Sequence, residues 1–150
     1  MEMDYRRVLI LCTGNICRSP MAEAILRARL TALKPDALVE SAGIGAPVGK
    51  PADPVAVDLM AARGLDISEH RARQISGDMI REFPLLIVME AMQQEYIEKR
   101  WPLSRGRVHT LGRWGGFEIP DPYRGDYADF EKALVLIDRG IDDWFEKIWD

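Results

Sequence analysis

The sequence predicts an α/β protein in which a four-stranded parallel sheet is flanked by helices on both faces. Short apolar runs alternate with longer amphipathic stretches along the 150 residues, as strands alternate with helices in this class. The run Leu85-Leu86-Ile87-Val88-Met89 has no polar member, which is typical of a parallel strand covered on both faces. No linker, repeat or low-complexity segment divides the sequence, so we expect one domain over residues 1–150.

The first half of the chain begins with Val8-Leu9-Ile10-Leu11, an apolar run that predicts the first strand. A helix is expected over 21–33, where apolar residues share one face and Lys34-Pro35-Asp36 ends the pattern. A second strand over 37–40 leads into a loop over 41–54 that is rich in glycine and proline. Asp53-Pro54 is a helix-start pair, and it predicts a helix that ends before Gly64.

The second half repeats the alternation. A short helix is expected after Ser76, followed by a strand over 85–89, a helix over 91–100 and a last strand over 108–111. A loop over 112–125 then precedes an apolar stripe at helical spacing, which we interpret as core. Its members are Phe130, Ala133, Leu134, Ile137, Ile141, Trp144, Phe145 and Ile148.

Composition narrows the functional class. Apolar residues make up 47% and charged residues 29% of the chain, which is ordinary for a globular protein and argues against disorder. The formal net charge of −4 gives no support for nucleic-acid binding. The start, Met1-Glu2-Met3-Asp4-Tyr5-Arg6-Arg7, is polar and resembles neither a signal peptide nor a membrane span, so we expect a cytoplasmic protein that is not inserted in a membrane.

The segment Cys12-Thr13-Gly14-Asn15-Ile16-Cys17-Arg18-Ser19-Pro20 follows the first expected strand directly. Gly14, and Asn15 more weakly, can take the positive φ of a tight curl that aims backbone N–H groups at an anion. Arg18 offers a planar fork of donors for two phosphate oxygens, and Ser19-Pro20 fits a helix start whose positive end favours a thiolate at Cys12. These features predict covalent phosphoryl transfer on Cys12.

A purely structural role for Cys12 is the alternative, because cysteine is often buried as a small apolar residue. A bare Cys-x5-Arg pattern is a weak signal. The order of strand, cysteine, Gly-Asn, arginine, Ser-Pro and amphipathic helix favours the functional interpretation.

The segment from Cys12 to Pro20, with Met21-Ala22-Glu23-Ala24 behind it, resembles the signature of the low-molecular-weight protein tyrosine phosphatases. The similarity continues through Ser41-Ala42-Gly43, His70-Arg71-Ala72-Arg73-Gln74 and Asp121-Pro122-Tyr123 and covers nearly the whole chain. The segments that most resemble the bacterial branch working with tyrosine autokinases in capsule and exopolysaccharide production are Val48-Gly49-Lys50, Met89-Glu90, Gly112-Arg113-Trp114 and Glu118 to Arg124.

The resemblance implies a role for each site residue. Cys12 is the nucleophile, Arg18 binds phosphate, and Asp121, fixed between Pro120 and Pro122, protonates the leaving phenol and then activates water. The other loop residues and Tyr123 are expected to bind the substrate, and Tyr123 stacks on its ring. The loop residues are Thr13, Gly14, Asn15, Ile16 and Cys17. Ser19, Ser41 and His70 are expected to support the loop through hydrogen bonds.

Two residues expected at the rim of the substrate pocket differ from those of relatives. Arg124 follows Tyr123, where eukaryotic members have a sequence similar to a Tyr-Tyr pair. Pro47 lies, on a loose alignment, where relatives often have a bulkier apolar or aromatic residue as a pocket wall.

The two cysteines lie in one loop, so they cannot staple distant parts of a fold. The resemblance favours a reversible Cys12–Cys17 disulfide that protects the nucleophile, while simple packing of Cys17 is the alternative. Zinc is less favoured, because Cys12, Cys17, His70 and His109 lack paired ligand spacings. No cofactor or metal is expected, since Arg18 and the loop amides supply positive charge.

Three rival functions stay open. A protein arginine phosphatase has a similar loop with threonine in place of Ile16, and arsenate reductases of this scaffold use further downstream cysteines. A phosphate-binding module without turnover is the third. For the phosphatase we expect a phosphotyrosine protein as partner, with a membrane tyrosine autokinase as the candidate, no nucleic acid, and a monomeric state.

Overall fold

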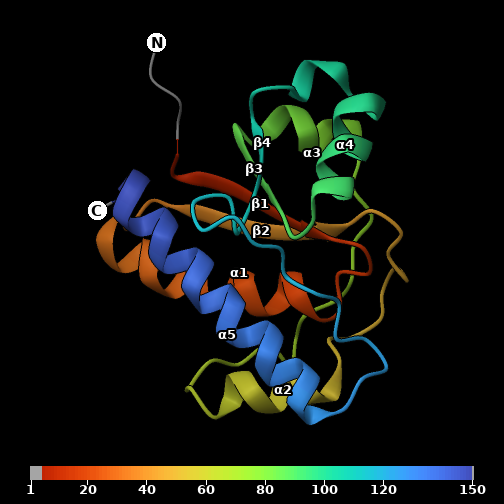
Figure 1. Ribbon diagram of the computed structural model, residues 1–150, viewed down its shortest axis with the longest axis vertical. Helices are drawn as coiled ribbons and strands as arrows, with labels where there is room; N and C mark the ends of the chain where they lie inside the picture. Colours follow the sequence, from red (N-terminus) through yellow and green to blue (C-terminus); the bar gives the residue numbers. More distant parts are fainter. Residues whose placement is uncertain (1–4, 150) are drawn as a thin grey trace.

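The four strands form one parallel sheet in the order β2-β1-β3-β4 (Figure 1). The computed structural model describes residues 5–149, so Met1 to Asp4 of the polar start, and Asp150, lie outside the described part. Pairing places Leu11 of β1 beside Ala42 of β2 and Val88 of β3, and Val88 beside Thr110 of β4. The strands are β1 Arg7–Cys12, β2 Leu38–Gly43, β3 Leu85–Val88 and β4 Val108–Thr110. The predicted four-stranded parallel sheet is confirmed.

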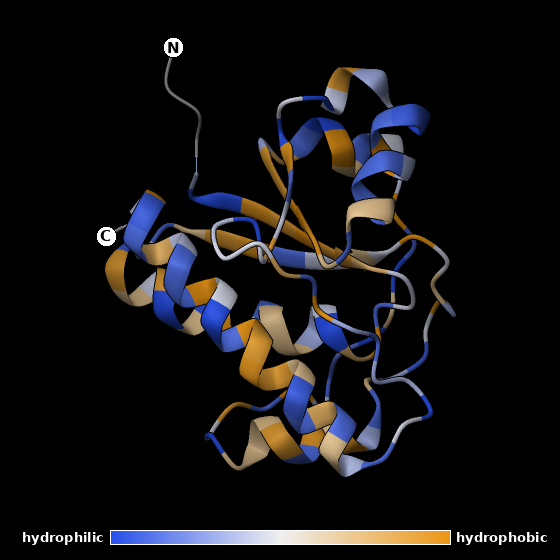
Figure 2. Cartoon of the chain, in the orientation of Figure 1, coloured by the Kyte–Doolittle hydropathy of each residue, from blue (hydrophilic) through white to orange (hydrophobic). Residues whose placement is uncertain are grey.

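Helices cover both faces of the sheet, as predicted. On one face lie α1 (Arg18–Leu33), α2 (Pro54–Ala61) and α5 (Tyr127–Trp144), and on the other lie α3 (Gly77–Glu82) and α4 (Ala91–Arg100) (Figure 1). Successive side chains of β1 point to opposite faces of the sheet, so the protein has one apolar core on each face. Ile10 packs toward α1 and α5, whereas Leu11 packs toward α3. Figure 2 shows the apolar strands between these layers and polar residues on the outer helix faces. A 3-10 turn (Pro102–Ser104) and a final π-helical turn (Phe145–Trp149) complete the elements.

The start of α1 corrects one prediction. The helix begins at Arg18, and Cys17 rather than Ser19 is the N-cap, without a side-chain cap hydrogen bond. Ser19 lies inside the first turn, where its hydroxyl oxygen is 2.9 Å from the Cys12 sulfur. The hydroxyl is therefore directed at the nucleophile candidate instead of at a backbone N–H.

The second strand is longer than predicted. It runs to Gly43 and includes Ser41, because the pairing with β1 continues to Cys12 beside Gly43. Gly43 permits a close approach there, since a Cβ atom on it would lie 2.7 Å from the Thr13 carbonyl oxygen. Ser41 is thereby held beside the loop that follows Cys12.

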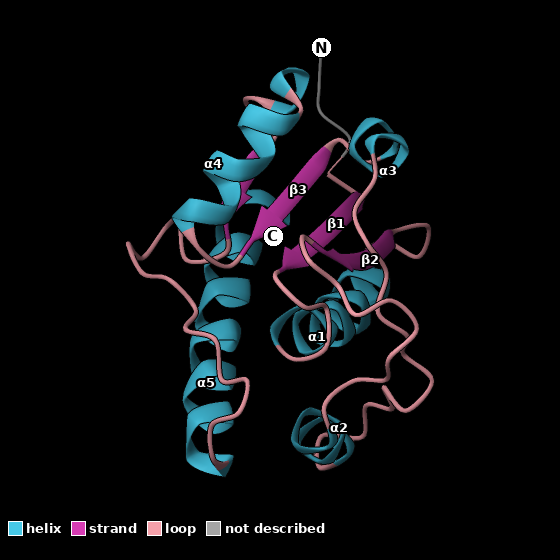
Figure 3. Cartoon of the chain, turned by 90° about the vertical axis from the view of Figure 1, so that its right-hand side faces the viewer, coloured by secondary structure: helices cyan, strands magenta, loops and turns pink. Residues whose placement is uncertain are grey.

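All four strands end at the same edge of the sheet, and Figure 3 looks onto this edge with the connecting loops in front. The loop after Cys12 leads into α1 at this edge, as expected for a site in a parallel α/β sheet. Across residues 5–149, no helix has both the length and the apolar character needed to cross a membrane.

Candidate active site

Residues 13–17 form a tight loop over the buried sulfur of Cys12, which is 2% exposed. The backbone N–H of Asn15 points at this sulfur at 3.2 Å, and the Ser19 hydroxyl approaches it at 2.9 Å. The positive φ needed for the curl is at Asn15 (φ 56°), whereas Gly14 has none, so the prediction that favoured Gly14 is wrong. The sequence placed the curl correctly but not the residue that makes it.

The Asn15 side chain explains why the left-handed conformation settles there. Its Nδ2 donates to the hydroxyls of Ser19 (2.8 Å) and Ser41 (2.9 Å), and its Oδ1 accepts from the backbone N–H of Arg73 at 2.9 Å. His70 Nε2 lies 2.7 Å from the Asn15 carbonyl oxygen. Because Asn15 is fully buried and these bonds need its amide, the conformation is held from several elements.

The same network orients two hydroxyl protons. Since the Ser19 hydroxyl oxygen accepts a hydrogen bond from Asn15 Nδ2, its own hydroxyl hydrogen is free to point at the Cys12 sulfur. Ser41 likewise accepts from Asn15 and donates to the Glu23 carboxylate. The Ser19 hydroxyl is thus placed to donate a hydrogen bond to the Cys12 sulfur.

Arg18 lies under the loop with its side chain 1% exposed. Its Nη1 donates to Glu90 Oε1 at 2.5 Å and to the Ile119 carbonyl oxygen at 2.8 Å. Its Nη2 is 3.6 Å from Asp121 Oδ2, and its buried Nε–H has no acceptor among residues 5–149. A buried donor without an acceptor is costly, so this N–H is a donor available to an anionic ligand in the adjoining pocket.

Two residues of the site were missed by the sequence reasoning as functional candidates. Glu90 follows β3 at the carboxyl edge of the sheet and holds Arg18. Gln93, in the first turn of α4, accepts from the backbone N–H groups of Met89 (2.9 Å) and Glu90 (3.0 Å) and donates to the Thr13 hydroxyl at 3.1 Å. A carboxylate directly after a buried parallel strand was the available signal for Glu90.

A pocket of about 200 Å³ opens above the Cys12 sulfur. The loop after Cys12 forms its floor, and segments from two other loops form its walls. Its lining residues are Cys12, Thr13, Gly14, Ile16, Cys17, Arg18, Gly45, Pro47, Asp121 and Tyr123. The structure thus brings together the predicted nucleophile, arginine, acid and aromatic wall. Asn15, although part of the loop, lies outside the lining, as do Ser19, Ser41 and His70, which contact the loop through Asn15.

Asp121 is half exposed at the pocket wall and is held by its neighbours. Its Oδ1 accepts from the backbone N–H of Tyr123 at 3.1 Å, and prolines stand on both sides of it. The Tyr123 ring is 49% exposed and lines the pocket beside the carboxylate. One carboxyl oxygen is therefore committed to the turn, and Oδ2 faces Arg18.

Cys17 is buried next to the same loop, and both cysteines are free thiols. Burial raises the pKa of the Cys17 thiol far above its usual range, and the charges of Asp53 and Cys12 raise it further. Cys17 is consequently a neutral thiol at physiological pH. His109 lies in β4, outside the pocket, and its Nδ1 contacts Arg113 at 3.1 Å. The described residues contain no group of three or more metal-ligating side chains arranged to hold an ion.

Comparisons with known proteins match the whole described chain. The family model of the low molecular weight phosphotyrosine protein phosphatases matches residues 7–150. The probable low molecular weight protein-tyrosine-phosphatase EpsP of Ralstonia nicotianae is 48% identical over 143 residues, covering 95% of this chain and 96% of EpsP. Wzb of Escherichia coli K12, also a low molecular weight protein-tyrosine-phosphatase, is 39% identical, with 96% of each chain covered. The crystal structure of the tyrosine phosphatase amsI from Erwinia amylovora superposes with a TM-score of 0.90 at 30% identity, covering 99% of this chain and 100% of amsI.

Proposed function

The chain belongs to the low molecular weight phosphotyrosine protein phosphatase family and is an enzyme of that class, and we propose that its catalytic residues are Cys12, Arg18 and Asp121. One observation supports this most directly: the Cys12 sulfur, the Arg18 guanidinium and the Asp121 carboxylate border one pocket. The proposed substrate is a phosphotyrosine side chain, with its phosphate on the floor and its ring against Tyr123.

In the first step, the Cys12 sulfur attacks phosphorus in line with the leaving phenol oxygen. The S–P bond forms as the P–O bond to the ring breaks, and Asp121 gives its proton to the departing oxygen. Arg18 and the N–H groups of residues 13–17 hold the three equatorial oxygens, where charge spreads in the transition state. The products are free tyrosine side chain and phosphocysteine.

In the second step, Asp121, now ionised, removes a proton from water as the water oxygen attacks phosphorus. The S–P bond breaks with its electron pair on the Cys12 sulfur, inorganic phosphate leaves, and Asp121 keeps the proton from water for the next cycle. The Ser19 hydroxyl, 2.9 Å from the sulfur, stabilises the departing thiolate. Tyr123 and the pocket depth favour an aryl phosphate over the shorter phosphoserine.

Ile16 lines the pocket and supports phosphotyrosine over phosphoarginine as substrate. An apolar side chain there cannot hydrogen-bond a guanidino group, so a phosphoarginine would leave polar N–H groups without partners.

We propose further that the substrate protein is a tyrosine autokinase of exopolysaccharide production and that the enzyme acts on it in the cytoplasm as a monomer. The similarity to EpsP and Wzb, together with the bacterial-branch segments around residues 48–50, 89–90 and 112–124, supports this pathway. Retention of a phosphorylated autokinase by a Cys12→Ser variant, with release by excess phosphotyrosine, tests it. An autokinase that is neither retained nor dephosphorylated rules this partner out.

The reaction is tested with a phosphotyrosine peptide in the presence of EDTA, beside phosphoserine and phosphoarginine substrates. Wild type should release phosphate selectively from phosphotyrosine, and Cys12→Ser should abolish it. Cys17→Ser makes the same change five residues along the same loop and should retain turnover. Preference for phosphoarginine, or equal loss in both cysteine variants, contradicts the assignment.

A further inference from the structure

Arg124 occupies a backbone conformation that does not suit it. The turn from Pro122 to Gly125 closes with a hydrogen bond from the Gly125 N–H to the Pro122 carbonyl oxygen at 2.8 Å, and Arg124, its third residue, has a φ of 66°. Turns with positive φ at this position favour glycine or asparagine. Among residues 5–149 the only other non-glycine residue with positive φ is Asn15, which the active-site network holds in place.

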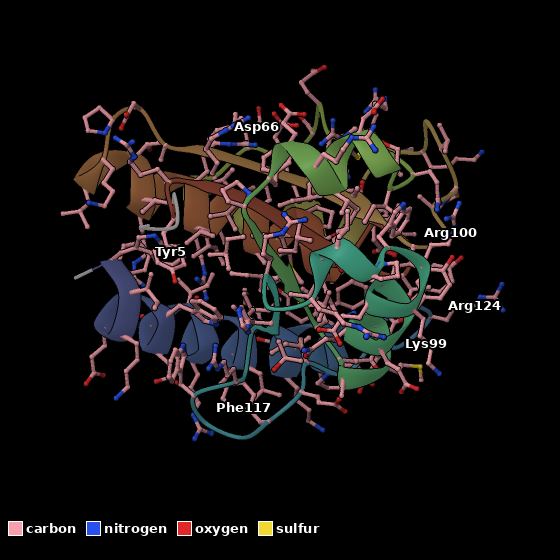
Figure 4. The ribbon with its side chains drawn as sticks, turned by 90° about the horizontal axis from the view of Figure 1, so that it is seen from above. Tyr5, Asp66, Lys99, Arg100, Phe117 and Arg124 are labelled. Carbon is pink, nitrogen blue, oxygen red and sulfur yellow. The ribbon has the colours of Figure 1, made fainter. Side chains whose placement is uncertain are left out.

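No comparable network accounts for Arg124. Its guanidinium carbon lies 5.4 Å from the centroid of the Tyr123 ring, and within residues 5–149 it makes no ion pair. Figure 4 shows Arg124 at the margin of the molecule, where its side chain extends away from the body. Residues with strained backbone conformations are concentrated at ligand-binding sites. We therefore ask what the Arg124 side chain could bind at this position.

The position of this charge is specific. Tyr123 lines the pocket, and Arg124 stacks on Tyr123 from outside the lining. A phosphotyrosine inserted between Tyr123 and Pro47 therefore leaves the neighbouring residues of its own chain near the guanidinium. Arg124 is also the one cationic residue between Asp121 and Asp129, a segment whose other charges are Asp121, Asp126 and Asp129.

We propose that Arg124 sets substrate preference by binding an anionic group, a carboxylate or a second phosphate, beside the phosphotyrosine of the substrate protein. The inference rests on the proposed function and adds to it a recognition residue outside the phosphate pocket. A guanidinium matches the planar oxygen pairs of either anion with two hydrogen bonds. Without Arg124 the charged side chains of segment 121–129 are all acidic, so loss of the residue removes the positive charge of this segment that would attract such a peptide.

The test compares kcat/KM for two phosphotyrosine peptides that differ only by glutamate or glutamine at the residues flanking the phosphotyrosine. Wild type should prefer the glutamate peptide about three- to fivefold, mostly through KM, as exposed charge pairs allow. In Arg124→Asn, which tolerates the positive φ and folds, the ratio should fall to one or below. Arg124→Lys should restore part of it, and 0.5 M salt should weaken it in wild type.

Arg105→Asn is the matched control, because it removes the same charge from an exposed arginine before β4, at the opposite edge of the sheet. Its glutamate-to-glutamine ratio should equal that of wild type. A wild-type ratio of one, or equal ratios in the two asparagine variants, overturns the inference while phosphotyrosine turnover still stands. A third peptide, with phosphoserine beside the phosphotyrosine, distinguishes the two anions. If wild type prefers this peptide more strongly than the glutamate peptide, the site binds phosphate. If the preference is weaker, the site binds carboxylate.

Discussion

Replacing Glu90 tests how far Arg18, the proposed phosphate-binding arginine, depends on a partner outside its loop. Arg18 is buried, and its Nη1 has two acceptors, Glu90 Oε1 at 2.5 Å and the Ile119 carbonyl oxygen at 2.8 Å. Glu90→Gln keeps an acceptor oxygen of the same size and removes the charge. The change therefore isolates the charge-assisted part of one hydrogen bond.

The magnitude follows from that difference. With glutamine the bond still joins the charged Arg18 guanidinium, so the hydrogen bond remains and only the attraction between opposite charges is lost. The Glu90 side chain is 27% exposed, so water screens the pair and the loss is about 1 kcal/mol, the upper end for solvent-exposed ion pairs. Glu90→Gln should reduce kcat/KM about fivefold. Glu90→Ala also removes the acceptor, and a loss of about 2–3 kcal/mol predicts a reduction of about 30- to 150-fold.

The assay is kcat and KM on a phosphotyrosine peptide, with urea unfolding in parallel to separate activity from stability. Glu95→Gln is the matched control, because Glu95 lies on the same helix and, among residues 5–149, pairs only with Lys99 at the surface. It should leave kcat/KM unchanged. An increase in kcat/KM in Glu90→Gln would refute the reasoning, since Glu90 would then compete with phosphate for Arg18 instead of orienting it.

Three further predictions follow from the site and its surroundings. Asp121→Asn should lower kcat about 100-fold or more on a phosphotyrosine peptide but much less on an activated aryl phosphate, whose leaving oxygen needs no proton; equal losses on both would contradict the acid role. Cys17 is held as a neutral thiol by burial, so a disulfide with Cys12 requires peroxide to oxidise Cys12 to the sulfenic acid first; wild-type activity lost to excess peroxide should then return with dithiothreitol, whereas Cys17→Ser, whose sulfenic acid is oxidised on to sulfinic acid, should recover much less. Burial and Arg113 lower the pKa of His109, so the unfolded chain binds a proton before the folded one does, and the urea midpoint should fall as the pH drops below about 6.5; His109→Gln should flatten this dependence, and an unchanged slope would exclude His109 as its source.

The sequence was sufficient for the sheet and for the residues that carry a local signal. Cys12 and Arg18 were predicted from the strand, curl and helix start around them, Asp121 was predicted from the family resemblance, and the structure brings all three to one pocket. Glu90 and Gln93 escaped notice as functional residues, because their contacts with Arg18 and Thr13 span 72 and 80 residues and follow from the packing of β3 beside β1.

Local rules also failed where distant groups decide the conformation. Glycine is the intrinsic choice for positive φ, yet Asn15 takes it because Ser41 and Arg73 bind its side chain. Ser19 has the composition of a helix cap, but the Cys12 sulfur and the Asn15 amide surround its hydroxyl instead. In both cases tertiary hydrogen bonds prevailed over residue preference.

The hydrogen bonds of Asn15 also bear on the stage of folding at which this site forms. Besides the local contacts with Cys12 and Ser19, its partners Ser41, His70 and Arg73 are 26, 55 and 58 residues away along the chain, so much of the network that holds the loop after Cys12 is distant in sequence. Contacts of such separation form only after long stretches of chain have been closed into loops. The regain of turnover on refolding therefore reports the assembly of β1 with β2 and the segment before α3, and no amino-terminal fragment that stops before residue 73 can hold the nucleophile loop in its active shape.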